Sequence, residues 1–152
     1  ENSDYEINNK VIRSELNVEK KLKLTEVKTF KKFIKEINSS RDDLVRLLKK
    51  INKSGKKVHC YGASTKGNVL LQYFNIDNKV INYAAERNKN KYNLYTPGSN
   101  IKIISEILSR FHKPDYYLVL PWHFKNEILE RERLIRKKGT KFIFPLPKLK
   151  IV

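Results

Sequence analysis

The sequence predicts an α/β fold in which a small parallel sheet of four to five strands is covered by helices and preceded by a long N-terminal helix. From residue 25 to residue 53, apolar residues recur at spacings of three and four, as they do on one face of a helix. After Gly55, short and nearly continuous apolar runs alternate with helical patterns, which is typical of a parallel sheet buried on both faces. Because crossovers between parallel strands are right-handed, these elements favour a Rossmann-like sandwich.

The N-terminal third of the chain is predicted to be mostly helical. Residues 1–10 are polar and are expected to be a linker, and residues 11–24 form a short, loosely periodic helix. The sharper apolar stripe that follows predicts one helix of about seven turns, ended by Gly55, and its members are Val27, Phe30, Ile34, Ile37, Leu44, Leu48 and Ile51. Residues 40–43 could instead cap a second helix. The chain is therefore divided into residues 1–24, a linker and short helix, and residues 25–152, the leading helix with the sheet domain.

The remaining elements alternate in order along the chain. Strands are expected at residues 57–61, 80–84, 116–120 and 141–144, with a short last strand at residues 149–152. The helices between them cover residues 65–74, 104–112 and 124–138, and a loop runs from residue 88 to residue 100. Apolar residues of the first of these helices should face the sheet, namely Val69, Leu70, Tyr73 and Phe74. In the last helix, two i,i+4 ion pairs are expected, Glu127 with Arg131 and Glu132 with Arg136.

Composition limits the class of protein. The 152 residues suffice for one domain, and no apolar run approaches the roughly 20 residues that a membrane helix needs. The polar, acidic N-terminus does not have the features of a secretory signal, and a single cysteine suits a reducing cytoplasm.

Cys60 lies in a predicted strand and is expected to be a core residue. One cysteine and three scattered histidines supply no ligand pair at zinc spacing, so no metal site is expected. His59, in a strand, and His112, near a helix end, are interpreted as structural.

The formal net charge of +17 raises the alternative of a nucleic-acid partner or an acidic membrane. The excess of lysine and arginine is spread along the chain and does not form one block. The chain is also rich in Lys, Asn and Ile, a bias that the base composition of a genome can produce without any function. Nucleic-acid binding is therefore the less favoured alternative.

The segment between the first predicted strand and its helix points to an anionic ligand, and it reads Tyr61-Gly62-Ala63-Ser64-Thr65-Lys66-Gly67-Asn68. A helix N-terminus exposes unpaired N–H groups and a partial positive charge, so it receives phosphate well. Here the turn adds two hydroxyls, one lysine and two glycines that allow a tight turn or a close approach of a ligand. We expect it to hold the diphosphate of a nucleotide. It matches neither specific phosphate-loop signature, so a plain strand–helix turn with a solvated Lys66 is the alternative.

Two further clusters come directly after predicted strands. Glu86 stands where dinucleotide-binding folds place an acidic residue that bonds ribose hydroxyls, and Arg87 contacts the ligand or pairs with Glu86. Trp122 and His123 follow the third strand, and His123 is a ligand contact, an acid–base group or a helix cap. Because carboxyl ends of parallel strands share one edge, these clusters should be neighbours of the Gly62 turn.

The loop at residues 88–100 contains a turn, Tyr95-Thr96-Pro97-Gly98. The first interpretation of this segment is a structural turn. The alternative is that the loop lies over the ligand, where Tyr95 could stack on a base.

Four segments follow one another along the chain, and they read Y-G-A-S-T-K-G-N, A-E-R-N-x-x-K-x-x-x-Y-T-P-G, K-P-D-Y-x-L-V-L-P-W-H-F and K-F-I-F-P-L-P. In this order they resemble the C-terminal domain of sugar C-methyltransferases. The resemblance covers roughly residues 25–152. Enzymes of that family use S-adenosylmethionine to methylate nucleotide-linked keto-deoxysugars, and they combine an N-terminal zinc domain, a middle methyl-donor domain and this C-terminal domain. This chain has no cysteine cluster and no second glycine-rich loop, so the resemblance implies that zinc, S-adenosylmethionine and the catalytic residues belong to domains outside it.

The resemblance implies a binding domain for a nucleotide-diphosphate keto-sugar that works with the zinc and methyl-donor domains of the same polypeptide. The residues expected to bind this substrate are Tyr61, Gly62, Ala63, Ser64, Thr65, Lys66, Gly67, Asn68, Glu86, Arg87, Tyr95, Thr96, Pro97, Trp122 and His123. Two alternatives remain open. One is a docking domain without ligand affinity of its own, and the other is a basic nucleic-acid-binding domain.

Overall fold

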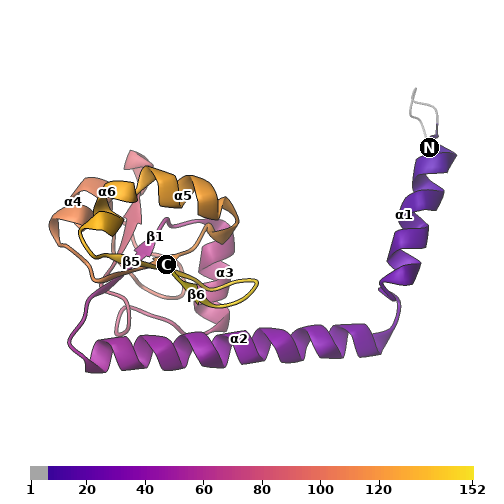
Figure 1. The fold of residues 1–152 in the computed structure, drawn as a ribbon, viewed down its shortest axis with the longest axis horizontal. Helices are drawn as coiled ribbons and strands as arrows, with labels where there is room; N and C mark the ends of the chain where they lie inside the picture. Colours follow the sequence, from indigo (N-terminus) through magenta and orange to yellow (C-terminus); the bar gives the residue numbers. More distant parts are fainter. Residues whose placement is uncertain (1–6) are drawn as a thin grey trace. The chain divides into compact units, whose positions relative to one another are not determined.

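The computed structural model describes residues 7–152, in which helices lie on both sides of a six-stranded sheet (Figure 1). Contacts divide the chain into two units, one up to Ser39 and one from Ser40 to Val152. The division falls inside a helix. No helix within residues 7–152 has both the length and the hydropathy that crossing a bilayer requires.

Two helices precede the sheet. Helix α1 covers Asn9–Lys21, and the side chain of Asn8 caps it by accepting a hydrogen bond of 3.1 Å from the backbone N–H of Val11. The predicted linker lies mostly at residues 1–6, outside the described range. Helix α2 covers Val27–Lys53 without interruption, so the prediction of one helix is confirmed and the alternative break at residues 40–43 is wrong.

The six strands follow the order β3-β2-β1-β4-β5-β6 across the sheet. The first five are parallel and β6 is antiparallel to β5, which confirms the α/β, Rossmann-like class. Their bounds are β1 Val58–Tyr61, β2 Tyr83–Glu86, β3 Ile103–Ser105, β4 Tyr116–Val119, β5 Lys141–Phe144 and β6 Lys150–Ile151. Since successive side chains of a strand point to opposite faces, and both faces are covered, the central strands are buried along nearly their whole length.

Helices α4, α5 and α6 lie on one side of the sheet, and α3 and the second half of α2 lie on the other (Figure 1). Their bounds are α3 Thr65–Tyr73, α4 Glu106–Phe111, α5 Lys125–Arg131 and α6 Arg133–Lys137. The core beneath α5 contains Tyr61, Tyr117, Val119, Phe142 and Ile128. Cys60, which alternates with Tyr61, is fully buried, as predicted for a core residue.

The side of α3 that faces the sheet differs from the prediction. Leu70 and Phe74 are buried as expected, but Val69 and Tyr73 are exposed and Leu71 is buried instead. The sheet is contacted by the face that carries Gly67 and Leu71, four residues apart and therefore one above the other on the helix.

Two short strands depart from the predicted pattern. The second strand begins at Tyr83, three residues later than predicted, because the carbonyl of Asp77 accepts hydrogen bonds from the N–H groups of Val80 and Ile81 and holds them in a turn. Strand β3 occupies residues predicted as the start of a helix. It ends at Ser105, whose hydroxyl accepts a 3.1 Å hydrogen bond from the N–H of Leu108 and caps α4.

The single predicted helix at residues 124–138 is wrong, since it is interrupted at Glu132 between α5 and α6. The Glu132 side chain is buried and accepts hydrogen bonds from the Tyr61 hydroxyl at 2.7 Å and from the Arg110 guanidinium at 2.5 Å. Arg131 contacts the Tyr61 hydroxyl and pairs with Glu106 at 3.0 Å. These long-range pairs take the place of the predicted i,i+4 pairs, and they tie α4 and the α5–α6 junction to β1.

A second polar cluster is buried on the same face of the sheet, the face that α4, α5 and α6 cover. The Nδ1 atom of His59 is 2.8 Å from the Ser109 hydroxyl, which is 2.8 Å from the Tyr117 hydroxyl. All three residues are almost completely buried. Burial, followed by the charges of His112 and Lys57, lowers the pKa of His59 to about 4. His59 is therefore a neutral residue of the core at neutral pH, in agreement with its structural interpretation.

Candidate functional site at the carboxyl edge of the sheet

The strand order changes direction between β1 and β4. From β1 the chain continues to β2 on one side, whereas β4 lies on the other side and continues to β5. In open parallel sheets, ligands bind at this point, outside the carboxyl ends of the two strands. The loops after β1 and β4 are the ones that carry the Gly62 turn and the Trp122-His123 pair, so two of the predicted clusters flank this point.

Direct contacts join the three predicted clusters. A Cβ atom added to Gly62 would lie 3.1 Å from the Cδ atom of Pro121, so the loops after β1 and β4 touch. The N–H of Ala63 donates to the Glu86 carboxylate at 3.0 Å, so the loops after β1 and β2 touch as well. Segments that are distant in sequence therefore meet at one edge of the sheet.

The turn after β1 has the form that a helix N-terminus requires. Gly62 has a φ of +81°, a conformation that favours glycine. Ser64 is the N-cap of α3, and its hydroxyl oxygen accepts a 3.1 Å hydrogen bond from the N–H of Gly67. The next two residues, Thr65 and Lys66, are exposed, and no described residue accepts a hydrogen bond from either of their N–H groups. This turn therefore presents two N–H groups, one hydroxyl and one ammonium to solvent.

The amide of Asn68, in the first turn of α3, contains a buried oxygen. Within residues 7–152 this Oδ1 atom has no hydrogen-bond partner. Buried acceptors are nearly always paired with a protein group, a water or a ligand. Asn68 is thus a candidate acceptor for a donor that comes from outside the chain.

Two predicted site residues in this turn have structural roles. A Cβ atom at Gly67 would lie 2.5 Å from the Cβ of Leu120, so this glycine allows α3 to pack directly against the end of β4. Tyr61 is buried, and its hydroxyl donates to Glu132 beneath α5.

Glu86, at the end of β2, accepts hydrogen bonds from several groups of the chain. Its Oε1 atom accepts from the N–H groups of Arg87 at 2.8 Å and Asn88 at 3.1 Å, and its Oε2 atom accepts from Ala63. The Nζ atom of Lys91 lies 3.3 Å from the same Oε2. Burial by itself raises the pKa of Glu86, but the N–H groups of Asn88, Ala63 and Arg87 and the charge of Lys91 together hold that pKa below its ordinary value. Glu86 is therefore an ionised acceptor.

Lys91 is a residue of this edge that sequence reasoning did not single out. It belongs to the short helix Lys89–Lys91 and donates to the carbonyl of Ala63 at 3.1 Å. The signal was present, because Lys91 is the lysine of the A-E-R-N-x-x-K segment. The ion pair expected between Arg87 and Glu86 is made by Lys91 in its place, and Arg87 contributes its backbone N–H.

The turn at residues 95–98 does not join the other clusters. The carbonyl of Pro97 accepts a 3.0 Å hydrogen bond from Gln72, near the last turn of α3, and the N–H of Asn78 donates to the carbonyl of Ser99. Both contacts lie where α3 ends and the chain returns to the amino-terminal edge of the sheet. Thr96 is buried and bonds the Ser99 hydroxyl at 2.7 Å. The structure therefore places Thr96 and Pro97 at the opposite edge from Gly62.

Tyr95 is exposed and pairs with Lys102 in an antiparallel bridge at the start of β3. Its position beside Thr96 likewise separates it from the Gly62 turn, and stacking on a base bound at that turn is not supported by this placement.

Trp122 and His123 begin a short helix, Trp122–Phe124, directly after β4. Trp122 is half-buried against the core beneath α5, whereas His123 is exposed. The His123 ring makes an edge contact with Trp122, at 5.4 Å between ring centroids, and lies 5.0 Å from the ring of Phe124. The neighbouring rings hold the imidazole at the carboxyl edge, on the β4 side of the point where the strand order reverses.

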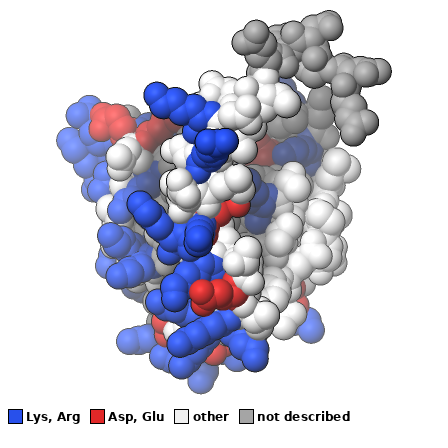
Figure 2. Space-filling model, turned by 90° about the vertical axis from the view of Figure 1, so that its right-hand side faces the viewer, with Lys and Arg blue, Asp and Glu red and all other residues white. Residues whose placement is uncertain are grey.

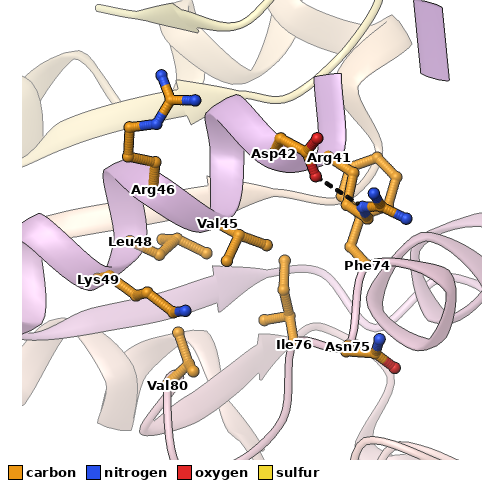
Figure 3. A pocket seen from close by; sticks show the side chains of 10 residues that line it. All are labelled: Arg41, Asp42, Val45, Arg46, Leu48, Lys49, Phe74, Asn75, Ile76 and Val80. Carbon is orange, nitrogen blue, oxygen red and sulfur yellow. Dashed lines mark hydrogen bonds and ion pairs between the residues drawn. The ribbon is translucent and has the colours of Figure 1, made fainter. Parts of the chain in front are cut away.

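Two cavities lie elsewhere in the domain. One of about 470 Å³ lies between the second half of α2 and the segment after α3, with Val45, Ile76 and Val80 among the side chains that point into it (Figure 3). Arg41 and Arg46 border it, but Arg41 pairs with Asp42 at 2.9 Å and Arg46 with Asp43 at 3.5 Å. A second cavity, of about 510 Å³, is bordered by Arg110, Lys113 and Lys138. Both lie near the amino-terminal edge of the sheet, away from the β1–β4 reversal.

On the side shown in Figure 2, lysine and arginine side chains are numerous, and some acidic side chains lie between them. Among residues 7–152, no three His, Cys, Asp or Glu side chains are grouped so that they could hold a metal ion.

Comparison with known proteins identifies the family. A sequence model described as the C-methyltransferase C-terminal domain matches residues 2–147. The chain belongs to this family. It is also 31% identical, over 123 residues, to the C-methyltransferase NovU of Streptomyces niveus. The match covers 81% of this chain but 29% of that relative. This C-methyltransferase C-terminal domain thus corresponds to less than a third of a protein with that activity, and the resemblance stated from the sequence is confirmed.

Proposed function

We propose that the carboxyl edge of the sheet binds the diphosphate of a nucleotide-linked keto-sugar, as the substrate-binding domain of an S-adenosylmethionine-dependent sugar C-methyltransferase. The observation that carries the proposal is the convergence of the capped N-terminus of α3 with the loops after β2 and β4 where the strand order reverses. Membership in the C-methyltransferase C-terminal domain family supports it. A role within a larger enzyme is supported by the match to 29% of a C-methyltransferase.

Each group at this edge suits a part of such a ligand. The N–H groups of Thr65 and Lys66, with the Thr65 hydroxyl and the Lys66 ammonium, can donate to diphosphate oxygens. The buried Asn68 oxygen can accept from a hydroxyl or N–H group of the ligand. His123 and Trp122 lie across the reversal point, where they can contact the sugar or the phosphates.

The chemical step belongs to the rest of the enzyme in this proposal. In the full enzyme, removal of a proton beside the ketone would give an enolate, and its carbon would take the methyl group of S-adenosylmethionine while S-adenosylhomocysteine leaves. We assign the methyl donor, the zinc ion and the proton-removing group to domains outside this chain. The part played by the present chain is to hold the diphosphate so that the keto-sugar points towards those domains.

Titration with thymidine diphosphate tests the proposal by isothermal calorimetry. The wild-type chain is expected to bind saturably, and Lys66→Ala is expected to weaken binding at least about tenfold, because a hydrogen bond to a charged group is lost. The matched control is Lys79→Ala, which removes an exposed lysine from the connection between α3 and β2 at the opposite edge. Absence of heat at millimolar ligand, or equal losses in the two variants, would contradict the proposal.

An apolar face in the first unit supports a second candidate function, which is docking to another part of the enzyme. Val27 is 69% exposed, Phe30 50% and Phe33 58%, and α1 adds exposed Val11, Ile12, Leu16 and Val18. Several large apolar side chains exposed on one helix are typical of an interaction site. The stripe that is buried at Leu44, Leu48 and Ile51 continues along α2 without a cover in the first unit.

Light scattering on the isolated chain tests docking. The exposed face is expected to make the chain self-associate, and the double variant Phe30→Ser, Phe33→Ser is expected to be monomeric. The control variant Lys28→Ser, Lys31→Ser changes the same helix without removing apolar surface. A wild-type chain that is monomeric at high concentration would count against this function.

A further inference from the structure

The carboxylate of Glu86 accepts from four donors at the carboxyl edge, and these donors belong to three segments of the chain. We propose that Glu86 and Lys91 are positioning residues that hold the turn after β1 in shape for the diphosphate, and that Glu86 does not bind the ribose. The inference rests on the proposed function, since it concerns the same site.

The peptide groups on both sides of Ala63 are held by this pair. The N–H of Ala63 donates to the Oε2 atom of Glu86 at 3.0 Å, and its carbonyl accepts from the Nζ atom of Lys91 at 3.1 Å. The two side chains pair with each other at 3.3 Å. Ala63 directly precedes Ser64, the N-cap of α3. The pair therefore fixes the residue from which the exposed N–H groups of Thr65 and Lys66 follow.

The remaining acceptor capacity of Glu86 is also used within the chain. An ionised carboxylate has about four acceptor positions. Two are taken at Oε2, by Ala63 and Lys91, and two at Oε1, by the N–H groups of Arg87 and Asn88. A ribose hydroxyl could bond this carboxylate only by displacing one of these donors. The side chain is also only 14% exposed, which limits the approach of a sugar.

This arrangement separates two roles that one acidic residue can have. A residue that bonds the sugar of the nucleoside affects only ligands that contain a nucleoside, such as thymidine diphosphate with its deoxyribose. A residue that holds the turn after β1 in shape affects the binding of every ligand with a diphosphate, including inorganic pyrophosphate. The two roles can therefore be told apart by comparing the two ligands on one variant.

The experiment measures dissociation constants for thymidine diphosphate and for inorganic pyrophosphate, on the wild-type chain and on Glu86→Gln. The amide NH₂ of glutamine cannot accept from the backbone N–H groups, so we expect both ligands to bind about tenfold more weakly, with the ratio of the two constants unchanged. Lys91→Met removes the other half of the pair and should give the same equal loss. Glu130→Gln, an exposed carboxylate on α5, is the matched control and should change neither constant.

Three outcomes overturn the inference. In the first, thymidine diphosphate binds more weakly to Glu86→Gln while pyrophosphate binds as before, which assigns Glu86 to the nucleoside. In the second, neither constant changes. A wild-type chain that binds neither ligand contradicts the proposed function, and the positioning role is then decided by hydrogen exchange at the Ala63 amide. Faster exchange of this amide in Glu86→Gln supports the role, and unchanged exchange is the third outcome that overturns it.

Discussion

Substitution of Gly67 by alanine tests whether packing inside the domain determines the shape of the turn after β1. It lies in the first turn of α3, where alanine is ordinarily the better helix former by about 1 kcal/mol. In this structure, however, an added Cβ would lie 2.5 Å from the Cβ, 2.8 Å from the Cδ1 and 3.0 Å from the Cγ of Leu120. Gly67→Ala is therefore expected to destabilise the protein, which is the reverse of the usual effect.

The magnitude follows from how little the neighbour can move. Carbon atoms in contact prefer about 3.5–4.0 Å, so α3 and β4 would have to separate locally by about 1 Å. The Cβ of Leu120 is fixed by the backbone directly after β4, and the side chain is completely buried. Overpacking of this kind costs about 1–3 kcal/mol. The fixed Cβ of Leu120 places the cost at the upper end of this range, about 3 kcal/mol. After subtraction of the helix-propensity gain of about 1 kcal/mol, we expect the free energy of unfolding to decrease by about 2 kcal/mol.

Urea unfolding, followed by circular dichroism and by the fluorescence of the single tryptophan, Trp122, measures this loss. A loss of about 2 kcal/mol corresponds to a decrease in Tm of about 4–8 °C for a chain of this length. Val69→Ala, at a position of the same helix that is 65% exposed, is the control and should change the free energy of unfolding by less than about 0.5 kcal/mol. A Gly67→Ala variant as stable as the wild type would refute the packing argument.

Three further predictions concern buried groups. Glu132→Ala should lower the free energy of unfolding by about 2 kcal/mol, because the buried Tyr61 hydroxyl loses its acceptor and Arg110 keeps only Glu106 as a partner; urea titration showing a loss below about 1 kcal/mol would contradict this. The pKa of His59 is about 4 in the fold, below its unfolded value, so the unfolded chain binds a proton first as the pH falls. The contribution of His59 to the free energy of unfolding should therefore be fully present above about pH 6.5 and decrease by about 3 kcal/mol towards pH 4. His59→Gln should remove that slope and His123→Gln should keep it. Burial raises the pKa of the Cys60 thiol, so this thiol should react with Ellman's reagent only on unfolding; rapid reaction of the native chain would be the opposite result.

Elements with a strong local pattern were predictable from the sequence. The stripe from Val27 to Ile51 determines α2, and the apolar run at residues 141–144 determines β5. The turn from Gly62 to Ser64 was placed correctly because glycine with a positive φ and a serine N-cap are local requirements. Weak patterns failed, as at β3, which has only three residues.

The parts of the site that the sequence left open depend on contacts between distant segments. Residue order alone could not show that Lys91 pairs with Glu86, that Gly67 faces Leu120, or that Glu132 is buried beside Arg110. It also could not show that the turn at Thr96 lies at the amino-terminal edge of the sheet.

The amino-acid sequence by itself determined the class of fold and the position of the turn that precedes α3, because periodicity, caps and turn residues act over a few neighbours in the chain. The family followed from the resemblance of four motifs, not from these local patterns. The tertiary structure decided which side chains of that turn face solvent and which are used internally. The physical reason is that each buried donor or acceptor must find a partner in space, and this partner can be far away along the chain. Glu86, which accepts from the N–H of Ala63, is 23 residues away from it.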